Sequence, residues 1–237
     1  MTTPGAPAKQ HCGVCGAAAP PPFRAPAPEI APDLDLRPGE PTRSTLPDWI
    51  ATCRGCGAAA PDLTALPPQA RAAVEGSAYH ALSGAHPEFA LPFLRWAMIL
   101  RETGDRAGAA EAMLQAAWSA DDAADSINAA RWRAEAAFLW GEPADIETAL
   151  RRIDVLRRAG EFEAAAAAAD RLAGRALDQT SASVLAFQRA RIATRDIGRH
   201  LISSAVPPPA HRPHVAARQR DRRDVLGRLF RGTRRDE

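Results

Sequence analysis

The sequence is poor in aromatic residues and contains no long apolar run. Phe, Trp and Tyr make up 5% of its 237 residues, although 46% of the residues are hydrophobic, with alanine contributing heavily. Strands favour β-branched and aromatic side chains, whereas alanine is the best helix former. We therefore expect a mainly α-helical protein. No window approaches the roughly 18 uncharged apolar residues that a membrane-spanning helix requires, so no transmembrane segment is expected.

Several motifs that commonly mark enzymes and exported proteins are also missing. The chain has no G-x-S-x-G sequence, no P-loop and no dinucleotide-binding glycine motif. Its N-terminus lacks the basic-then-apolar order of a signal peptide. We expect a cytoplasmic protein that is not an enzyme.

Proline and charge divide the chain into three parts. Fourteen of the 21 prolines fall within residues 1–68, where they exclude long helices because proline fixes φ and removes a backbone donor. Residues 69–205 are rich in alanine, leucine and arginine at helical spacing. Residues 206–237 carry nine arginines and four acidic groups, a net charge of +5. These parts are interpreted as a proline-rich module, a helical domain and a basic tail that is disordered or forms a short amphipathic helix.

The helical domain is expected to contain seven helices. Glycines at Gly104-Asp105 and Ala159-Gly160 predict short turns between helices, and Asp121 or Asp122 is expected to cap the helix that follows. The predicted ranges are 69–83, 88–103, 106–119, 123–140, 145–158, 161–177 and 181–204.

Large and small residues alternate along two of the predicted helix pairs. The first pair carries Phe93, Trp96, Ala97 and Leu100 on one helix and Ala109, Met113 and Ala116 on the next. The second, weaker pair carries Ile153 and Leu156, followed by Ala165, Ala169 and Leu172. This spacing resembles a tetratricopeptide repeat. The two turn glycines are 56 positions apart, so an irregular tetratricopeptide-like stack with an extra helix is predicted, rather than a regular array.

All four cysteines occur in two C-x-x-C pairs, Cys12 with Cys15 and Cys53 with Cys56. Each pair places two sulfurs on one tight turn, and zinc in a structural site prefers four such ligands. A glycine follows each pair and permits the left-handed backbone of the turn. A hairpin in the linker, with Trp49-Ile50-Ala51 as a strand, would bring the pairs together. We expect one structural zinc ion in a small zinc-ribbon-like module.

Other interpretations of the cysteines remain open. A redox dithiol is disfavoured because nothing resembles the strand–helix junction that carries one. An iron–sulfur site or unmetallated thiols remain as further alternatives. Catalytic zinc is disfavoured because four thiolates leave no coordination position for water.

Two longer stretches resemble a family of uncharacterised bacterial proteins. They read DLDLRPGEPTRSTLPDWIATCRGCGAAAPDL and AAWSADDAADSINAARWRAEAA, and the similarity extends over residues 11–175. In that family a CPxCG, a D-x-D-x-RP segment and a CPxCGY-x-A-x-DL precede a helical domain. In this chain, Gly13 and Arg54 stand where the family carries the proline of each CPxC turn, and Ala58 stands where it carries the tyrosine of CPxCGY. The resemblance implies the same two-part organisation and no particular activity.

The leading functional hypothesis is a zinc-binding scaffold that presents a helical-hairpin surface to a protein or peptide. The alternative is a nucleic-acid-binding accessory protein that uses the zinc ribbon and the arginine-rich tail, where Val225, Leu226, Leu229 and Phe230 would line one side of a helix. An enzyme is a third possibility. A small charged cluster in the proline-rich loop contains Asp33, Asp35 and Arg37. It would either bind a partner or a phosphate-bearing ligand, or its charges would pair with each other or with the ribbon backbone. We expect the second of these.

Overall fold

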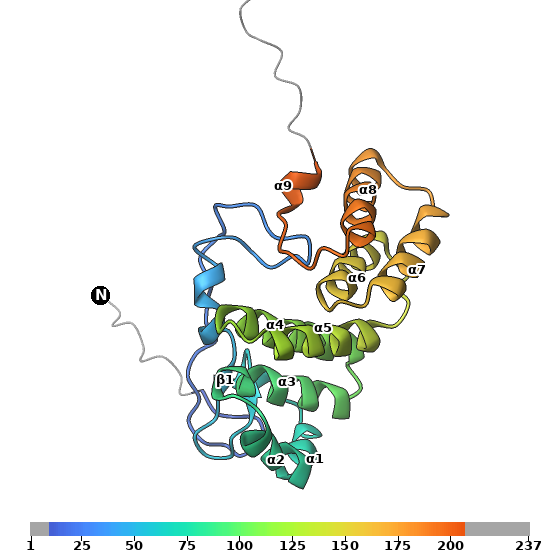
Figure 1. Cartoon of the computed structure of the whole chain (residues 1–237). Coiled ribbons are helices and arrows are strands. Elements are labelled where there is room, and N and C mark those ends of the chain that lie inside the picture. The colour runs from blue at the N-terminus through green and yellow to red at the C-terminus, as the bar shows by residue number, and fades with distance from the viewer. Residues whose placement is uncertain (1–9, 207–237) are drawn as a thin grey trace, which may run out of the picture. The chain divides into compact units, whose positions relative to one another are not determined.

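The computed structural model describes residues 10–206 and is mainly helical (Figure 1). Within this range, no helix combines the length and the apolarity that would let it cross a bilayer. The amphipathic helix expected around residues 225–230 lies outside the described residues.

The described part of the proline-rich region, residues 10–68, contains little regular structure. A two-residue strand β1 (Ala51–Thr52) pairs antiparallel with β2 (Ala59–Ala60). Short 3-10 helices cover Arg43–Asp48 and Leu63–Ala65. The strand expected at Trp49-Ile50-Ala51 therefore begins only at its last residue.

Nine α-helices and a 3-10 turn at Glu88–Ala90 follow within the described chain. The α-helices are α1 (Ala70–Glu75), α2 (Ser77–Ala85), α3 (Leu91–Glu102), α4 (Arg106–Asp122), α5 (Ser126–Trp140), α6 (Ile146–Arg158), α7 (Phe162–Ala173), α8 (Gln179–Ala193) and α9 (Ile202–Ala205). The single helix predicted for 69–83 is wrong. Gly76 takes an extended conformation (φ −69°, ψ 141°) and separates α1 from α2.

Four of the helices end in the same hydrogen-bonded turn. The second residue past each helix lies in the left-handed region with φ between 52° and 89°, namely Gly104, Ala124, Gly160 and Arg195. The amide of the next residue donates to the carbonyl five positions earlier, at 2.8 Å from Asp105 to Leu100 and at 3.0 Å from Glu161 to Leu156. This is the Schellman motif, which satisfies carbonyls that a helix end leaves without a partner.

Two of these turns lack glycine, and both caused errors in the sequence-based ranges. The helix expected from 123 begins at Ser126, because Ala124 carries the left-handed turn. The helix expected to run to 204 ends at Ala193, because Arg195 does the same. A residue other than glycine is uncommon in this conformation, so the sequence gives no glycine to mark either helix end.

The cap of α5 is also different from the expected one. Asp125 is the N-cap, and its side chain accepts a hydrogen bond from the Asn128 amide at 3.1 Å. Asp121 and Asp122 instead form the last turn of α4, where a carboxylate cannot serve as the cap of the next helix.

The helices pack as successive antiparallel neighbours, with α4 and α5 between α1–α3 and α6–α8 (Figure 1). Most residues expected at the hairpin interfaces are buried, including Phe93, Ala97, Ala109 and Ala116. A second apolar cluster joins the cysteine turns to α1, α2 and α3. The described residues 10–206 thus form one compact unit. The boundaries near 68 and 205, which rest on changes in amino-acid composition, stay predictions.

The turn residues generate a matched pair of stability predictions. Ala124 and Gly104 are both exposed and left-handed, and a Cβ at Gly104 meets no atom within 4 Å. Ala124→Gly should stabilise the protein by about 0.5 kcal/mol, because the strain relieved outweighs the added chain entropy of the unfolded state. Gly104→Ala should destabilise it by about 1 kcal/mol. Urea unfolding measures both, and shifts of the same sign would contradict the assignment of these turns.

Candidate metal centre and buried ion-pair network

The structure brings the four cysteine sulfurs into one cluster. All four Sγ atoms lie within 4.8 Å of one another. The separation is 3.9 Å between Cys12 and Cys56 and 3.6 Å between Cys15 and Cys53. Four thiolates at the usual Zn–S distance around a tetrahedral zinc lie about 3.8 Å apart. This cluster could therefore hold a metal ion, and its donor set fits one that prefers thiolates.

The two cysteine turns have the same backbone geometry. The knuckles, defined as residues 12–16 and 53–57, each end in a glycine with φ 74°. In the first, the Gly16 amide donates to the Cys12 carbonyl at 2.9 Å. In the second, Gly57 donates to Cys53 at 2.8 Å. The two turns thus present their sulfurs in matching ways to one point.

The thiols of the cluster differ in acidity. Burial disfavours the thiolate of Cys53, but hydrogen bonds from the Cys56 and Gly55 amides outweigh it and lower the pKa of Cys53 to about 7. Burial, together with the neighbouring sulfurs, raises the pKa of Cys56 to about 12. A bound cation would remove this mutual repulsion, because it is the opposite charge that four adjacent thiolates need.

The knuckles are attached to the helices by hydrogen bonds and close packing. The hydroxyl of Tyr79 on α2 donates to the Gly57 carbonyl at 2.9 Å, and Arg71 on α1 donates to the Val14 carbonyl. A Cβ at Gly13 would lie 2.3 Å from the Leu66 carbonyl oxygen. The first knuckle therefore requires glycine at position 13.

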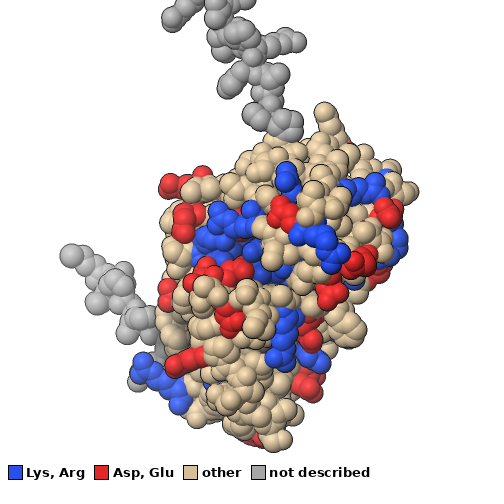
Figure 2. Space-filling view, in the orientation of Figure 1, with Lys and Arg blue, Asp and Glu red and all other residues tan. Residues whose placement is uncertain are grey.

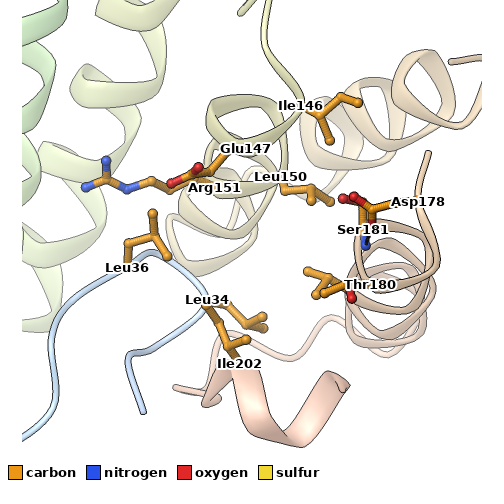
Figure 3. A pocket seen from close by; sticks show the side chains of 11 residues that line it. Leu34, Leu36, Ile146, Glu147, Leu150, Arg151, Asp178, Thr180, Ser181 and Ile202 are labelled. Carbon is orange, nitrogen blue, oxygen red and sulfur yellow. Dashed lines mark hydrogen bonds between the residues drawn. The ribbon is translucent and has the colours of Figure 1, made fainter. Parts of the chain in front are cut away.

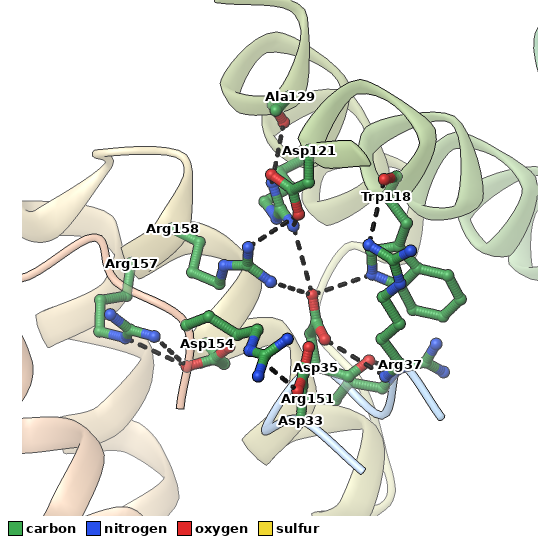
Figure 4. A network of polar contacts seen from close by, with 12 residues as sticks. Asp33, Asp35, Arg37, Trp118, Asp121, Ala129, Arg151, Asp154, Arg157 and Arg158 are labelled. Atoms are coloured by element: carbon green, nitrogen blue, oxygen red, sulfur yellow. Dashed lines mark hydrogen bonds and ion pairs between the residues drawn. The ribbon is translucent and has the colours of Figure 1, made fainter. Parts of the chain in front are cut away.

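A second cluster of charged residues lies buried on the other side of α4, around Asp35 (Figure 4). The Asp35 side chain is 0% exposed, and its Oδ2 accepts hydrogen bonds from Trp118 Nε1 at 3.0 Å and from Arg158 Nη1 at 2.9 Å. Arg133 Nη2 lies 3.5 Å away. Burial opposes the charge, yet Arg158 and Arg133 lower the pKa of Asp35 to about 2. Asp35 is therefore a buried carboxylate that stays ionised.

Asp121 completes the pairing of the two arginines. Arg133 approaches it with two nitrogens, at 3.0 Å and 2.5 Å, and Arg158 Nη2 lies 2.8 Å from the same carboxylate. Each guanidinium thus bridges Asp35, in the loop before the helices, to Asp121 at the end of α4. Planar guanidinium groups suit such bridging because their donors form a rigid fork.

Two further arginines attach irregular segments to the helices. Arg37 donates to the Trp118 carbonyl at 3.1 Å and pairs with Asp122 at 2.5 Å. Arg157 pairs with Asp154 at 2.7 Å and also donates to the Gly198 carbonyl at 2.9 Å. The loop around Asp35 and the segment after α8 are therefore both held against α4 and α6.

The expected partners of Asp33, Asp35 and Arg37 were each other or the ribbon backbone, and most of the observed partners are different ones. Arg37 donates its amide to Asp35 at 3.2 Å, but the charges pair with helices α4, α5 and α6 and, for Asp33, with Arg43 at 2.9 Å. All three residues are at most 1% exposed. They are therefore closed to a phosphate or a partner, and their function is to fix the loop.

Sequence reasoning missed the partners of this loop. The sequence alone places these partners in predicted helices and assigns none of them a role of its own, namely Trp118, Arg133, Arg151, Arg157 and Arg158. One signal was present, because Lys9 is the single lysine among 30 basic residues. A strong preference for arginine over lysine is typical of cations that form buried or bidentate ion pairs. The guanidinium donates through a rigid planar fork, which the ammonium group of lysine lacks.

Comparisons with known proteins identify no relative. No family model, no curated protein and no solved structure matches this chain.

Charges of both signs are mixed on the visible surface. Figure 2 shows arginines lying beside acidic residues over the helices on that face, without a broad region of one sign. Residues 10–206 contain 20 arginines and 24 acidic residues, a net charge of −4. Nucleic-acid binding depends mainly on positive charge facing the phosphates. Neither the net charge of residues 10–206 nor the face in Figure 2 supplies such a positive surface.

The network predicts that Asp35→Asn is strongly destabilising. Removing the charge of one member of a buried ion pair costs about 3–5 kcal/mol, and here Arg133 and Arg158 would be left to share the Asp121 carboxylate. The control is Asp170→Asn, which breaks an exposed pair with Arg189 and should cost at most about 1 kcal/mol. Urea unfolding at pH 7 compares them, and equal costs would refute the assigned role of Asp35.

The pH dependence of the same variant follows from the lowered pKa. The pKa of Asp35 is lower in the folded state than in the unfolded chain, so its charge stabilises the fold above the usual pKa near 4. That contribution is lost as the pH falls toward about 2. The difference in unfolding free energy between wild type and Asp35→Asn should therefore shrink over this interval. A difference in unfolding free energy that stays constant with pH would contradict the lowered pKa of Asp35.

Proposed function

We propose that this protein is a non-enzymatic zinc-binding scaffold that presents helical hairpins to a protein or peptide partner. The observation that carries the zinc assignment is the cluster of four sulfurs within 4.8 Å of one another. Cys12, Cys15, Cys53 and Cys56 would be the ligands of one ion in a zinc-ribbon-like module. A complete set of four thiolates leaves no open position, so the ion would be structural.

The attachment of the knuckles to α1 and α2 supports a structural role for the metal. Tyr79 and Arg71 hold one knuckle carbonyl each, and the apolar residues around the sulfurs continue into α3. An ion bound there would tie the ends of a proline-rich segment to the helices. That segment has few hydrogen bonds of its own to keep it folded.

The hairpins α3–α4 and α6–α7 support a tetratricopeptide-like interpretation of the helical part. Small side chains such as Ala97 and Ala165 are at most 1% exposed at the hairpin interfaces and allow the helices to approach closely. Both hairpins also turn through a left-handed glycine. Stacked hairpins of this kind commonly serve as protein-binding surfaces.

Membership of the uncharacterised bacterial family remains part of the proposal. Its two characteristic stretches touch in this structure, since Asp35 and Arg37 of the first contact Trp118 and Asp122 of the second. This contact gives a physical reason for the two stretches to occur together. The nucleic-acid alternative depends on the tail beyond residue 206.

Metal analysis tests the zinc assignment. The purified chain should contain one zinc and no reactive thiol, whereas Cys53→Ser should hold substoichiometric zinc and unfold more easily. Structural zinc contributes about 10–16 kcal/mol to the folding of zinc-finger peptides. The control is His11→Ala, beside Cys12, which should keep its zinc because the thiolates suffice. A metal-free wild type, or iron in place of zinc, would overturn the assignment.

Affinity capture tests the scaffold role. The tagged full chain, confirmed as folded by circular dichroism, should retain a stoichiometric protein from a lysate of its source cells. Recovery of none would contradict the proposal. Capture that disappears with nuclease and falls steeply with salt would instead favour the nucleic-acid alternative.

A further inference from the structure

An apolar groove of about 470 Å³ lies where four segments meet (Figure 3). Leu34 and Leu36 come from the loop held by Asp35, while α6, α8 and α9 supply the other walls. Its apolar lining residues are Leu34, Leu36, Ile146, Leu150, Val184 and Ile202. The volume falls within the range of about 300–1,000 Å³ that is usual for ligand pockets.

The backbone at Leu36, which lines the groove, is strained. Leu36 has φ 63°, a left-handed conformation that costs a bulky residue about 1–2 kcal/mol. Glycine or asparagine would adopt it more easily. The Asp35 network and the turn from the Leu36 amide to the Asp33 carbonyl, at 2.9 Å, hold the loop in place. The strain is explained if the leucine side chain is needed as a wall of the groove.

The charges at the rim are unbalanced toward the negative. Arg151 is neutralised, because it pairs with Glu111 and donates to the Asp35 carbonyl at 2.8 Å. Glu147 and Asp178 are exposed at the rim, and neither forms an ion pair within residues 10–206. Asp178 caps α8 by accepting from the Ser181 amide at 2.7 Å, which requires an acceptor but no charge. The rim thus presents two carboxylates beside an apolar floor.

We propose that this groove binds a peptide segment of a partner protein that carries bulky apolar side chains flanked by arginine or lysine. The apolar side chains fill the space between Leu36, Leu150 and Val184, and the flanking cations face Glu147 and Asp178. This is the helix-in-groove or extended-anchor mode, in which a few apolar anchors supply affinity and rim charges select the partner. The inference rests on the scaffold role and adds where the partner binds and which side chains its bound segment carries.

Panning a displayed library of random 12-residue peptides on the full zinc-loaded chain tests this inference. The enriched sequences should share two or more Leu, Ile, Phe or Met residues and carry a net positive charge. A synthetic peptide of the most enriched sequence then serves as the probe for titrations by fluorescence anisotropy. Enrichment of acidic or uncharged sequences, or no enrichment, would overturn the proposal.

Two groove variants locate the binding site. Leu36→Asn keeps a residue that tolerates φ above zero, so the fold should persist while affinity falls about tenfold. Glu147→Gln combined with Asp178→Asn removes the rim charge, keeps the helix cap and should weaken binding about threefold to tenfold at low salt. The matched control is Glu102→Gln with Asp105→Asn, a free glutamate and a capping aspartate on another hairpin. The control should bind like wild type.

The remaining outcomes separate this inference from the proposed function. If the peptide binds equally well to the groove variants, or if the control weakens it as much, the groove is not the site. Self-association that Leu36→Asn abolishes would assign the groove to a second copy of this chain and overturn the peptide proposal. In each of these cases a normal zinc content and a captured partner would leave the scaffold role standing.

Discussion

The arrangement of this protein depends on the ion pairs that the buried carboxylate of Asp35 forms with Arg133 and Arg158. Asp35 lies in a proline-rich loop with almost no secondary structure, yet it is fully enclosed by α4, α5 and α6. Burying a charge is unfavourable unless its partners are close and well oriented. Arg133 and Arg158 meet that condition and at the same time pair with Asp121. The loop is consequently held against α4, α5 and α6, and this position places Leu36 at the apolar groove.

The four cysteines provide a second, independent constraint on the same irregular region. Each knuckle lies at the tip of its own short antiparallel pairing, His11 with Ala18 and β1 with β2, and Arg71 and Tyr79 fix the two knuckles to α1 and α2. In the proposed function a zinc ion closes this site and the helical surface carries the interaction. The metal would then stabilise one end of the proline-rich region, while the Asp35 network positions its middle.

Much of the helical organisation followed from the sequence, and the exceptions share a cause. Alanine-rich segments, the glycine turns at Gly104 and Gly160 and the spacing of Phe93, Ala97 and Ala109 led to helices close to the observed ones. The errors at Ala124 and Arg195 arose where residues other than glycine adopt the left-handed turn. The misassigned caps at Asp121 and Asp122 arose because α4 continues through Asp122 to the turn at Ala124, so these two residues form its last turn.

The sequence by itself determined that the protein is mainly helical and that its cysteines form two equivalent turns, because composition and short-range spacing act locally. Only the tertiary structure decided that the sulfurs of Cys12, Cys15, Cys53 and Cys56 meet, that Asp35 lies between Arg133 and Arg158, and that Leu36 borders a groove. Asp35 and Arg158 are 123 residues apart. Contacts at such separations depend on how whole helices pack, and no local pattern in the chain encodes that packing.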